Sequence, residues 1–167
     1  MSRSDWAVLA VVSEGPTHGW PIVRELSADG GLGRVWTVAR AVVYRSLSTL
    51  EADGFVEACG EAPGARGPQR TIMRVTRSGR GALGRWLDTP VEHVRDVRTE
   101  LLLKLAVLDR AGRPTQNLIT RQLEQLGPVI AAVSGRPAGA GFDRVLARWR
   151  REQALAVARF LRAMTSN

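Results

Sequence analysis

The sequence predicts a mainly α-helical protein with one small two-stranded β ribbon and a pair of antiparallel helices near its end. Apolar residues recur at helical spacing over most of the 167 residues. Two short β-type segments flank a stretch rich in Gly and Pro, and two heptad-spaced segments follow in the second half. We therefore expect two domains, residues 1–90 and 91–167.

The first half carries start and stop signals for three short helices. The first helix starts at Ser4-Asp5 and ends at Glu14-Gly15-Pro16, and the second follows His18-Gly19. The third runs from Thr37, a candidate N-cap, to Asp53-Gly54, where Gly supplies a left-handed C-cap conformation. Three short helices with tight connections predict a helix-turn-helix core.

The third helix has two different faces. Val43, Leu47 and Leu50 recur at helical spacing and are expected to face the core. Arginine suits guanine edges or phosphate, and Tyr44 and Thr37 suit phosphate. A merely solvated helix face is the alternative interpretation. The outward positions carry basic, aromatic and hydroxyl side chains, namely Arg40, Tyr44, Arg45, Ser46 and Thr49.

The two β-type segments follow the third helix directly. Phe55–Cys59 and Arg70–Val75 are the predicted strands, and Gly60–Gln69 connects them with Arg66 near its tip. A ribbon at this place is typical of the wing of a winged helix. No acidic residue occurs between Glu61 and Asp88, so we expect Arg66 and Arg70 to reach the minor groove or the backbone of DNA. A solvated loop is the alternative. The arginines of this acid-free run are Arg66, Arg70, Arg74, Arg77, Arg80 and Arg85.

In the second half, an apolar run predicts a helix over 98–110, and heptad spacing predicts two long helices after it. Gly127-Pro128 should bend or break the first long helix, because Pro has no backbone N–H. A turn over 134–141 makes the two long helices antiparallel, and we expect them to pack on a second copy of the chain. Packing within one chain is the alternative. The expected dimer contacts are Leu123, Leu126, Ile130, Phe142, Leu146, Trp149 and Phe160.

The composition limits the classes of binding partner and of reaction that we expect for this chain. The net charge of +8 points to nucleic acid first and to a membrane surface second. Cys59 is the only cysteine, which excludes an intrachain disulfide and a cysteine-based zinc site. No segment is long and apolar enough to cross a membrane, so we expect a soluble, cytoplasmic protein. No cluster of catalytic or metal-ligating residues is visible, and we expect neither enzymatic activity nor a metal or cofactor.

Three ordered motifs resemble the PadR family of bacterial transcriptional regulators. They are GPTHGW at 15–20, VVYRSLSTLEADGFV at 42–56 and RTIMRVTRSGR at 70–80, with Trp20 standing where the family has Tyr. The resemblance implies a winged-helix homodimer held by C-terminal helices, usually a repressor and often released by a small molecule. It also implies that Tyr44 lies near the phosphate backbone and that the wing segment contacts DNA through Arg66, Gly67, Pro68, Gln69 and Arg70.

The sequence thus predicts a DNA-binding repressor that reads an inverted repeat as a homodimer, with half-sites about one helical turn apart. The alternative is a winged-helix scaffold whose basic second half binds an acidic protein. Trp6 and Trp149 are candidates for stacking on a small aromatic or hydrophobic effector. Packing in the core or in the dimer interface is the simpler interpretation of both rings.

Overall fold

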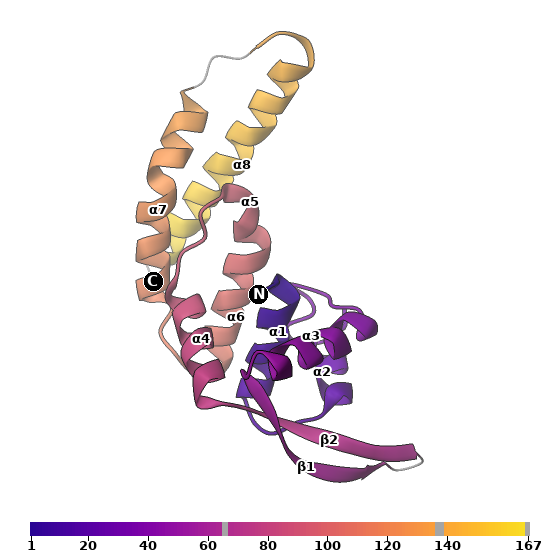
Figure 1. Ribbon diagram of the computed structural model, residues 1–167. Coiled ribbons are helices and arrows are strands. Elements are labelled where there is room, and N and C mark those ends of the chain that lie inside the picture. The colour runs from indigo at the N-terminus through magenta and orange to yellow at the C-terminus, as the bar shows by residue number, and fades with distance from the viewer. Residues whose placement is uncertain (65–66, 136–138, 166–167) are drawn as a thin grey trace. The chain divides into compact units, whose positions relative to one another are not determined.

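The computed structural model describes residues 1–64, 67–135 and 139–165. They form two compact units, Met1–Leu87 and Asp88–Asn167. The first unit holds three helices, a two-stranded antiparallel ribbon and most of a fourth helix, and the second unit is helical (Figure 1). The predicted class, a mainly helical chain with a two-stranded wing after a helix-turn-helix core, is confirmed.

The first three helices are α1 (Arg3–Ser13), α2 (Gly19–Glu25) and α3 (Arg40–Ala52). Helix α3 begins three residues after Thr37, so the prediction that Thr37 caps it is wrong. The Thr37 hydroxyl instead donates to the carbonyl oxygen of Gly33 at 2.8 Å, and Ala39 is the N-cap residue. The predicted end of the helix is confirmed, because Gly54 has a φ of +70°.

Helix α3 packs on α1 and α2 through one side only. Val43, Leu47 and Leu50 are buried there, as their spacing predicts. The same core contains buried apolar residues of α1, of α2, of the loop that follows α2, of the base of the ribbon and of α4 (Arg77–Asp88). This core fixes which face of α3 is left exposed. Its other large members are Val8, Leu9, Val12, Ile22, Leu26, Leu32, Val56, Met73, Val75, Leu83, Trp86 and Leu87.

The ribbon consists of β1 (Val56–Gly64) and β2 (Gly67–Val75), so most of the predicted connection is part of the strands. The register pairs Val56 with Val75 at the base and Gly64 with Gly67 at the far end. It shifts twice along β1, which is typical of β-bulges and lets a Gly- and Pro-containing segment stay paired. Thr17 and Met73 exchange two backbone hydrogen bonds of 3.0 and 2.7 Å. The turn before α2 is therefore tied directly to the wing.

The second unit begins with residues that lead from α4 into α5 (Val94–Asp96), a π-helical turn η1 (Val97–Leu101) and α6 (Leu102–Arg110). Two buried polar side chains hold this leading segment. The Gln122 amide accepts the Val91 N–H at 2.7 Å and donates to the Val91 carbonyl at 2.9 Å. The Lys104 ammonium donates to the Thr89 carbonyl at 2.7 Å and lies 3.2 Å from the Glu100 carboxylate. Burial lowers the pKa of Lys104, and Glu100 opposes that shift.

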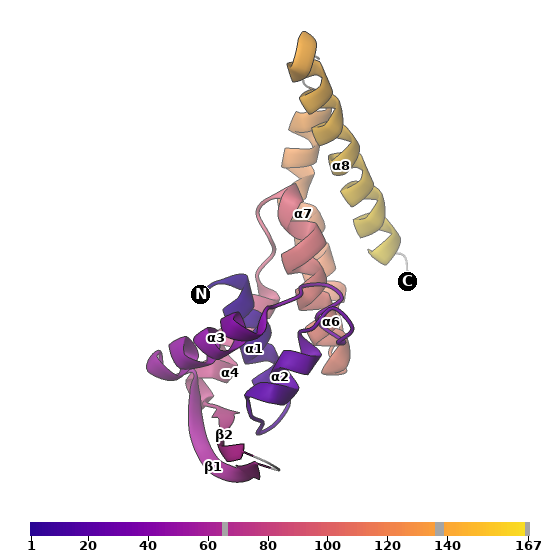
Figure 2. The same cartoon turned by 90° about the vertical axis from the view of Figure 1, so that its right-hand side faces the viewer.

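Helices α7 (Gln116–Ser134) and α8 (Gly141–Thr165) form an antiparallel hairpin, which both views display (Figure 1, Figure 2). Helix α7 runs through Pro128 without interruption, so of the two outcomes predicted there, a bend or a break, the break is wrong. Leu126 and Ile130 stay buried on either side of Pro128, because α8 packs along this face. Packing within the hairpin therefore outweighs the missing backbone hydrogen bond.

Helix α8 contacts α7 with a face that the heptad spacing does not predict. Its buried residues are Ala154, Ala158 and Leu161. Leu126 and Ile130 of α7 are buried in the same hairpin, so the expectation that they meet a second copy is wrong for the chain as folded. Leu123, Leu146 and Phe160 are half-buried. Phe142 and Trp149 are exposed by 74% and 60%.

Candidate nucleic-acid interface

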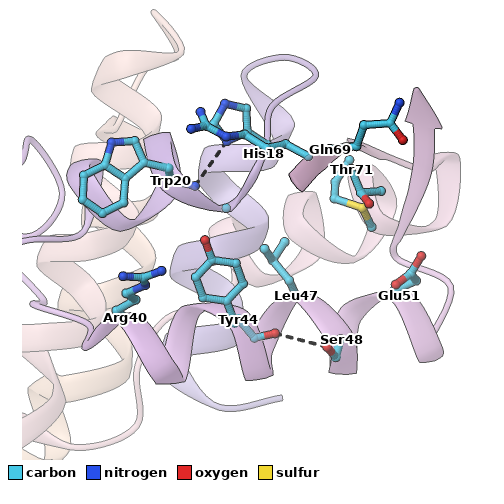
Figure 3. Close-up of a pocket in the computed structure, with 12 residues that line it drawn as sticks. His18, Trp20, Arg40, Tyr44, Leu47, Ser48, Glu51, Gln69 and Thr71 are labelled. Carbon is cyan, nitrogen blue, oxygen red and sulfur yellow. Dashed lines mark hydrogen bonds between the residues drawn. The ribbon is translucent and has the colours of Figure 1, made fainter. Parts of the chain in front are cut away.

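A cavity of about 620 Å³ opens where the start of α2, the outer face of α3 and strand β2 meet (Figure 3). The loop before α2 and its first turn supply His18, Gly19 and Trp20. Helix α3 and strand β2 supply the other walls. These are Arg40, Tyr44, Leu47, Ser48 and Glu51 from α3, and Gln69, Arg70, Thr71 and Met73 from β2.

Arg40, Tyr44 and Trp20 form a stack at one end of this cavity. The Arg40 guanidinium carbon lies 5.9 Å from the centre of the Trp20 ring and 5.8 Å from that of the Tyr44 ring. Both distances are within the range of cation–π attraction. Both rings are half exposed, which leaves the stack open to a partner.

Gly19 is required by this arrangement. A Cβ atom added at Gly19 would lie 2.5 Å from the Cε1 atom of Tyr44, so the Tyr44 ring rests against the α2 backbone. His18 is the N-cap residue of α2, and its Nδ1 atom accepts the Trp20 N–H at 3.4 Å (Figure 3). The motif GPTHGW thus builds the α2 side of the cavity.

The wing side of the cavity is polar and exposed. Gln69 and Arg70 lie on β2, as predicted for the wing contacts, and Arg70 pairs across the ribbon with Ala62. Glu51 is the one acidic residue in the lining, and it lies at the opposite end of α3 from Arg40. Gly67 begins β2 opposite Gly64. Arg66 and its predicted DNA contact lie outside the described residues.

The remaining predicted contacts on α3 divide into two groups. Arg45 and Thr49 are exposed on α3 but do not line the cavity. Ser46 is only 2% exposed, so the prediction that it faces outward is wrong. Burial raises the pKa of Asp5 on α1, but Ser46 and Ser2 outweigh burial and hold that pKa below its ordinary value of 3.8.

Sequence reasoning missed Trp20, Ser48 and Thr71 as members of this surface. Arg40, Tyr44 and Ser48 follow each other at intervals of four, so the helical period alone places Ser48 beside Tyr44. Thr71 lies two residues after Gln69, and alternation along a strand puts both on one face. The only sequence signal for Trp20 is its place in the GPTHGW motif, because no local sequence pattern predicts that α2 starts beside α3.

The candidate effector residues do not share a unit. Trp6 on α1 stacks on Trp86 of α4 with ring centres 5.1 Å apart and an interplanar angle of 8°. Trp149 belongs to α8 in the second unit and is exposed. The packing interpretation therefore accounts for Trp6, and Trp149 is left as the candidate contact for an effector.

Metal binding and membrane insertion have little support in the described part of the chain. The described residues contain no group of three or more His, Cys, Asp or Glu side chains that could hold a metal ion. Cys59 is exposed on β1, at a register shift of the ribbon. Among the described helices, none is both long and apolar enough to cross a membrane.

Residues 8–85 match the model of the transcriptional regulator PadR-like family. A probable transcriptional regulator of Mycobacterium tuberculosis is 28% identical over 105 residues, which are 63% of this chain and 54% of that protein. The chain thus spans about half the length of this relative.

Two solved structures of Bacillus subtilis PadR resemble the chain at low identity. The complex with operator DNA is 19% identical with a TM-score of 0.49, covering 96% of this chain and 97% of that one. The complex with p-coumaric acid is 18% identical with a TM-score of 0.44, covering 98% of this chain and 94% of that one.

Proposed function

We propose that this chain, whose residues 8–85 match the model of the transcriptional regulator PadR-like family, is a cytoplasmic repressor that binds an inverted-repeat operator as a homodimer. The observation that carries the proposal is the cavity between α3 and the wing, where Arg40 and Arg70 approach from two different elements. Helix α3 would enter the major groove, and the wing would lie along the adjacent backbone or minor groove.

The exposed side chains of α3 and of the wing would make different kinds of contact with DNA. Arg40 lies at the N-terminus of α3, the end of a recognition helix that contacts base edges. Tyr44, Arg45 and Thr49 would contact phosphates, which fix the position of the protein on the duplex. Gln69 and Arg70 would extend these contacts from the wing. Ser46 is not part of the proposed interface.

A second copy would pack on the unpartnered face of α8. Phe142, Val145 and Trp149 recur at intervals of three and four and are all exposed. A row of large exposed apolar side chains on one helix face marks an interaction site. Leu123, Leu146 and Phe160, which are half-buried, would add to the same interface. A small aromatic or hydrophobic effector would release the DNA, with Trp149 as its proposed contact.

The salt dependence of DNA binding tests this proposal. The probe is duplex DNA from the region upstream of the protein's own gene, and affinity is measured over a series of salt concentrations. We expect a log–log slope of about −5 or steeper, because a dimer making many phosphate contacts releases many counterions. A flat dependence, or no binding to any duplex, would contradict the proposal and favour a scaffold that binds an acidic protein.

Matched arginine variants locate the contact surface. Arg70→Ala and Arg45→Ala should each reduce the slope by about one for each protomer. Arg151→Ala removes the same charge from an exposed position on α8 and should leave the slope unchanged. An equal effect of all three variants would show that net charge, rather than the α3 and wing surface, attracts the DNA.

A further inference from the structure

Arg40 is the first residue of α3, and it is the arginine of this helix that two aromatic rings hold. Tyr44 lies one turn later on the same helix, and Trp20 comes from the first turn of α2. In the described part of the chain, no hydrogen bond or ion pair engages the Arg40 guanidinium. Cation–π attraction uses the charge of the guanidinium and none of its N–H donors, so these donors remain available to a partner.

We infer that Trp20 is a specificity-determining positioning residue, which orients Arg40 to read guanine at one position in each half-site. This inference rests on the proposed DNA-binding function. Arginine donates two parallel hydrogen bonds to O6 and N7 of guanine, and this pair distinguishes G·C from the other base pairs in the major groove. Such a contact needs a guanidinium that is held in one place, and the rings of Trp20 and Tyr44 restrain the Arg40 guanidinium from two sides of the cavity end.

The stack is built into the fold from both sides. Gly19 lets the Tyr44 ring come close to the start of α2, because any side chain at this position would meet that ring. The His18 cap and the Thr17–Met73 backbone pair then hold the start of α2 in place. Trp20 is therefore presented to Arg40 by a backbone that is fixed at several points.

Arg45 is the matched contrast on the same helix. It is exposed, as Arg40 is, and no aromatic ring is stacked against its guanidinium in the described structure. A long unsupported side chain suits a phosphate, which accepts hydrogen bonds from many directions. We therefore expect Arg45 to contribute to affinity for every sequence and Arg40 to contribute to the choice between sequences.

Selection from a randomised duplex library tests the assignment of Arg40. The duplexes are about 30 base pairs long, enough for two half-sites one helical turn apart. The wild-type protein should enrich an inverted repeat with a G·C pair at one symmetric position. Arg40→Ala and Arg40→Lys should lose the preference at that position alone, whereas Arg45→Ala should retain it and bind all sequences more weakly. Retention of the preference by Arg40→Ala would overturn the inference.

Competition between two selected duplexes, one with G·C and one with A·T at that position, tests the role of Trp20. Trp20→Ala should reduce the affinity ratio by about twofold to fivefold, the range expected for loss of one exposed cation–π contact. Trp20→Phe keeps an aromatic face and should recover most of the ratio. Equal loss of affinity for both duplexes would instead make Trp20 a backbone contact and overturn the inference.

These outcomes separate the inference from the proposed function. A wild-type protein that binds no duplex would contradict the proposed function itself. A wild-type protein that binds selectively, with a ratio that Trp20→Ala leaves unchanged, would contradict only the inference. Because Trp20 is half exposed, the variant is expected to fold, and its thermal unfolding is compared with that of the wild type.

Discussion

The carboxylate of Asp5 accepts the backbone N–H of Ser2 at 2.6 Å, and the Ser2 hydroxyl accepts the Asp5 N–H at 3.2 Å, so the two residues close a capping box at the start of α1. Ser46 on α3 is buried and helps to lower the pKa of the same carboxyl. Apolar contacts of Val43, Leu47 and Leu50 fix the depth of α3 in the core. Ser46 and Asp5 are buried polar side chains of α3 and α1, the two helices that pack on each other here.

Loss of the Ser46 hydroxyl should destabilise the first unit. Ser46→Ala removes a buried hydroxyl that helps to keep the Asp5 carboxyl ionised, which is expected to lower the free energy of unfolding by about 1 to 3 kcal/mol. Thr49→Ala removes a hydroxyl from the exposed side of the same helix and should change it by less than about 0.5 kcal/mol. Urea unfolding measures both, and equal effects would contradict the role given to Ser46.

The lowered pKa of Asp5 predicts how the stability of the first unit depends on pH. Because the folded-state pKa of Asp5 lies below its ordinary value of 3.8, its contribution to stability is present above pH 3.8 and is lost as the pH falls through the folded-state value. Asp5→Asn should therefore flatten the acid side of the stability profile. Unfolding measured from neutral pH down to strongly acidic pH checks this, and an unchanged slope in the variant would refute it.

The Gln122 amide predicts a large effect in the second unit. Gln122→Met leaves both the N–H and the carbonyl of Val91 without their side-chain partner, at a cost of about 2 to 5 kcal/mol. Gln125→Met makes the same replacement at an exposed position of α7 and should have little effect. Thermal unfolding of the two variants should therefore differ clearly. Similar melting temperatures would mean that water replaces the amide without cost.

The exposed face of α8 predicts an oligomeric state. Trp149→Glu places a charge in the centre of the proposed apolar interface and should convert a dimer into a monomer in sedimentation experiments. Thr120→Glu adds the same charge to an exposed position of α7 and should leave the dimer intact. A wild-type protein that sediments as a monomer would contradict the homodimer outright.

Much of the first unit could be predicted, because its local sequence signals agree with the way its elements pack. The core face of α3, its end at Gly54 and the presence of a wing follow from helical spacing, a glycine C-cap and alternating apolar residues. The start of α3 was misplaced because Thr37 has the side chain of an N-cap residue, yet its hydroxyl is used within the preceding loop. A capping residue alone does not reveal which turn it closes.

The remaining errors arise where distant parts of the chain decide the outcome. The burial of Ser46 does not follow from the helical pattern, because it depends on the packing of α3 on α1, which is distant in the sequence. The break at Pro128 was expected from local chemistry, but packing of α8 keeps α7 continuous. The stack of Trp20 on Arg40 depends on where α2 begins relative to α3, which no periodicity in the sequence encodes.

The most direct test of the claim that DNA binds at the surface formed by α3 and the wing is an NMR titration. The protein is labelled with ¹⁵N-tryptophan, and its indole N–H signals are followed as duplex DNA is added. Trp20 lines the cavity between α3 and the wing, whereas Trp86 is buried against Trp6 within the same unit. The account predicts that the Trp20 signal shifts and saturates with the duplex, while the Trp86 signal stays in place. A duplex that binds tightly without moving the Trp20 signal would contradict the claim that this surface receives the DNA.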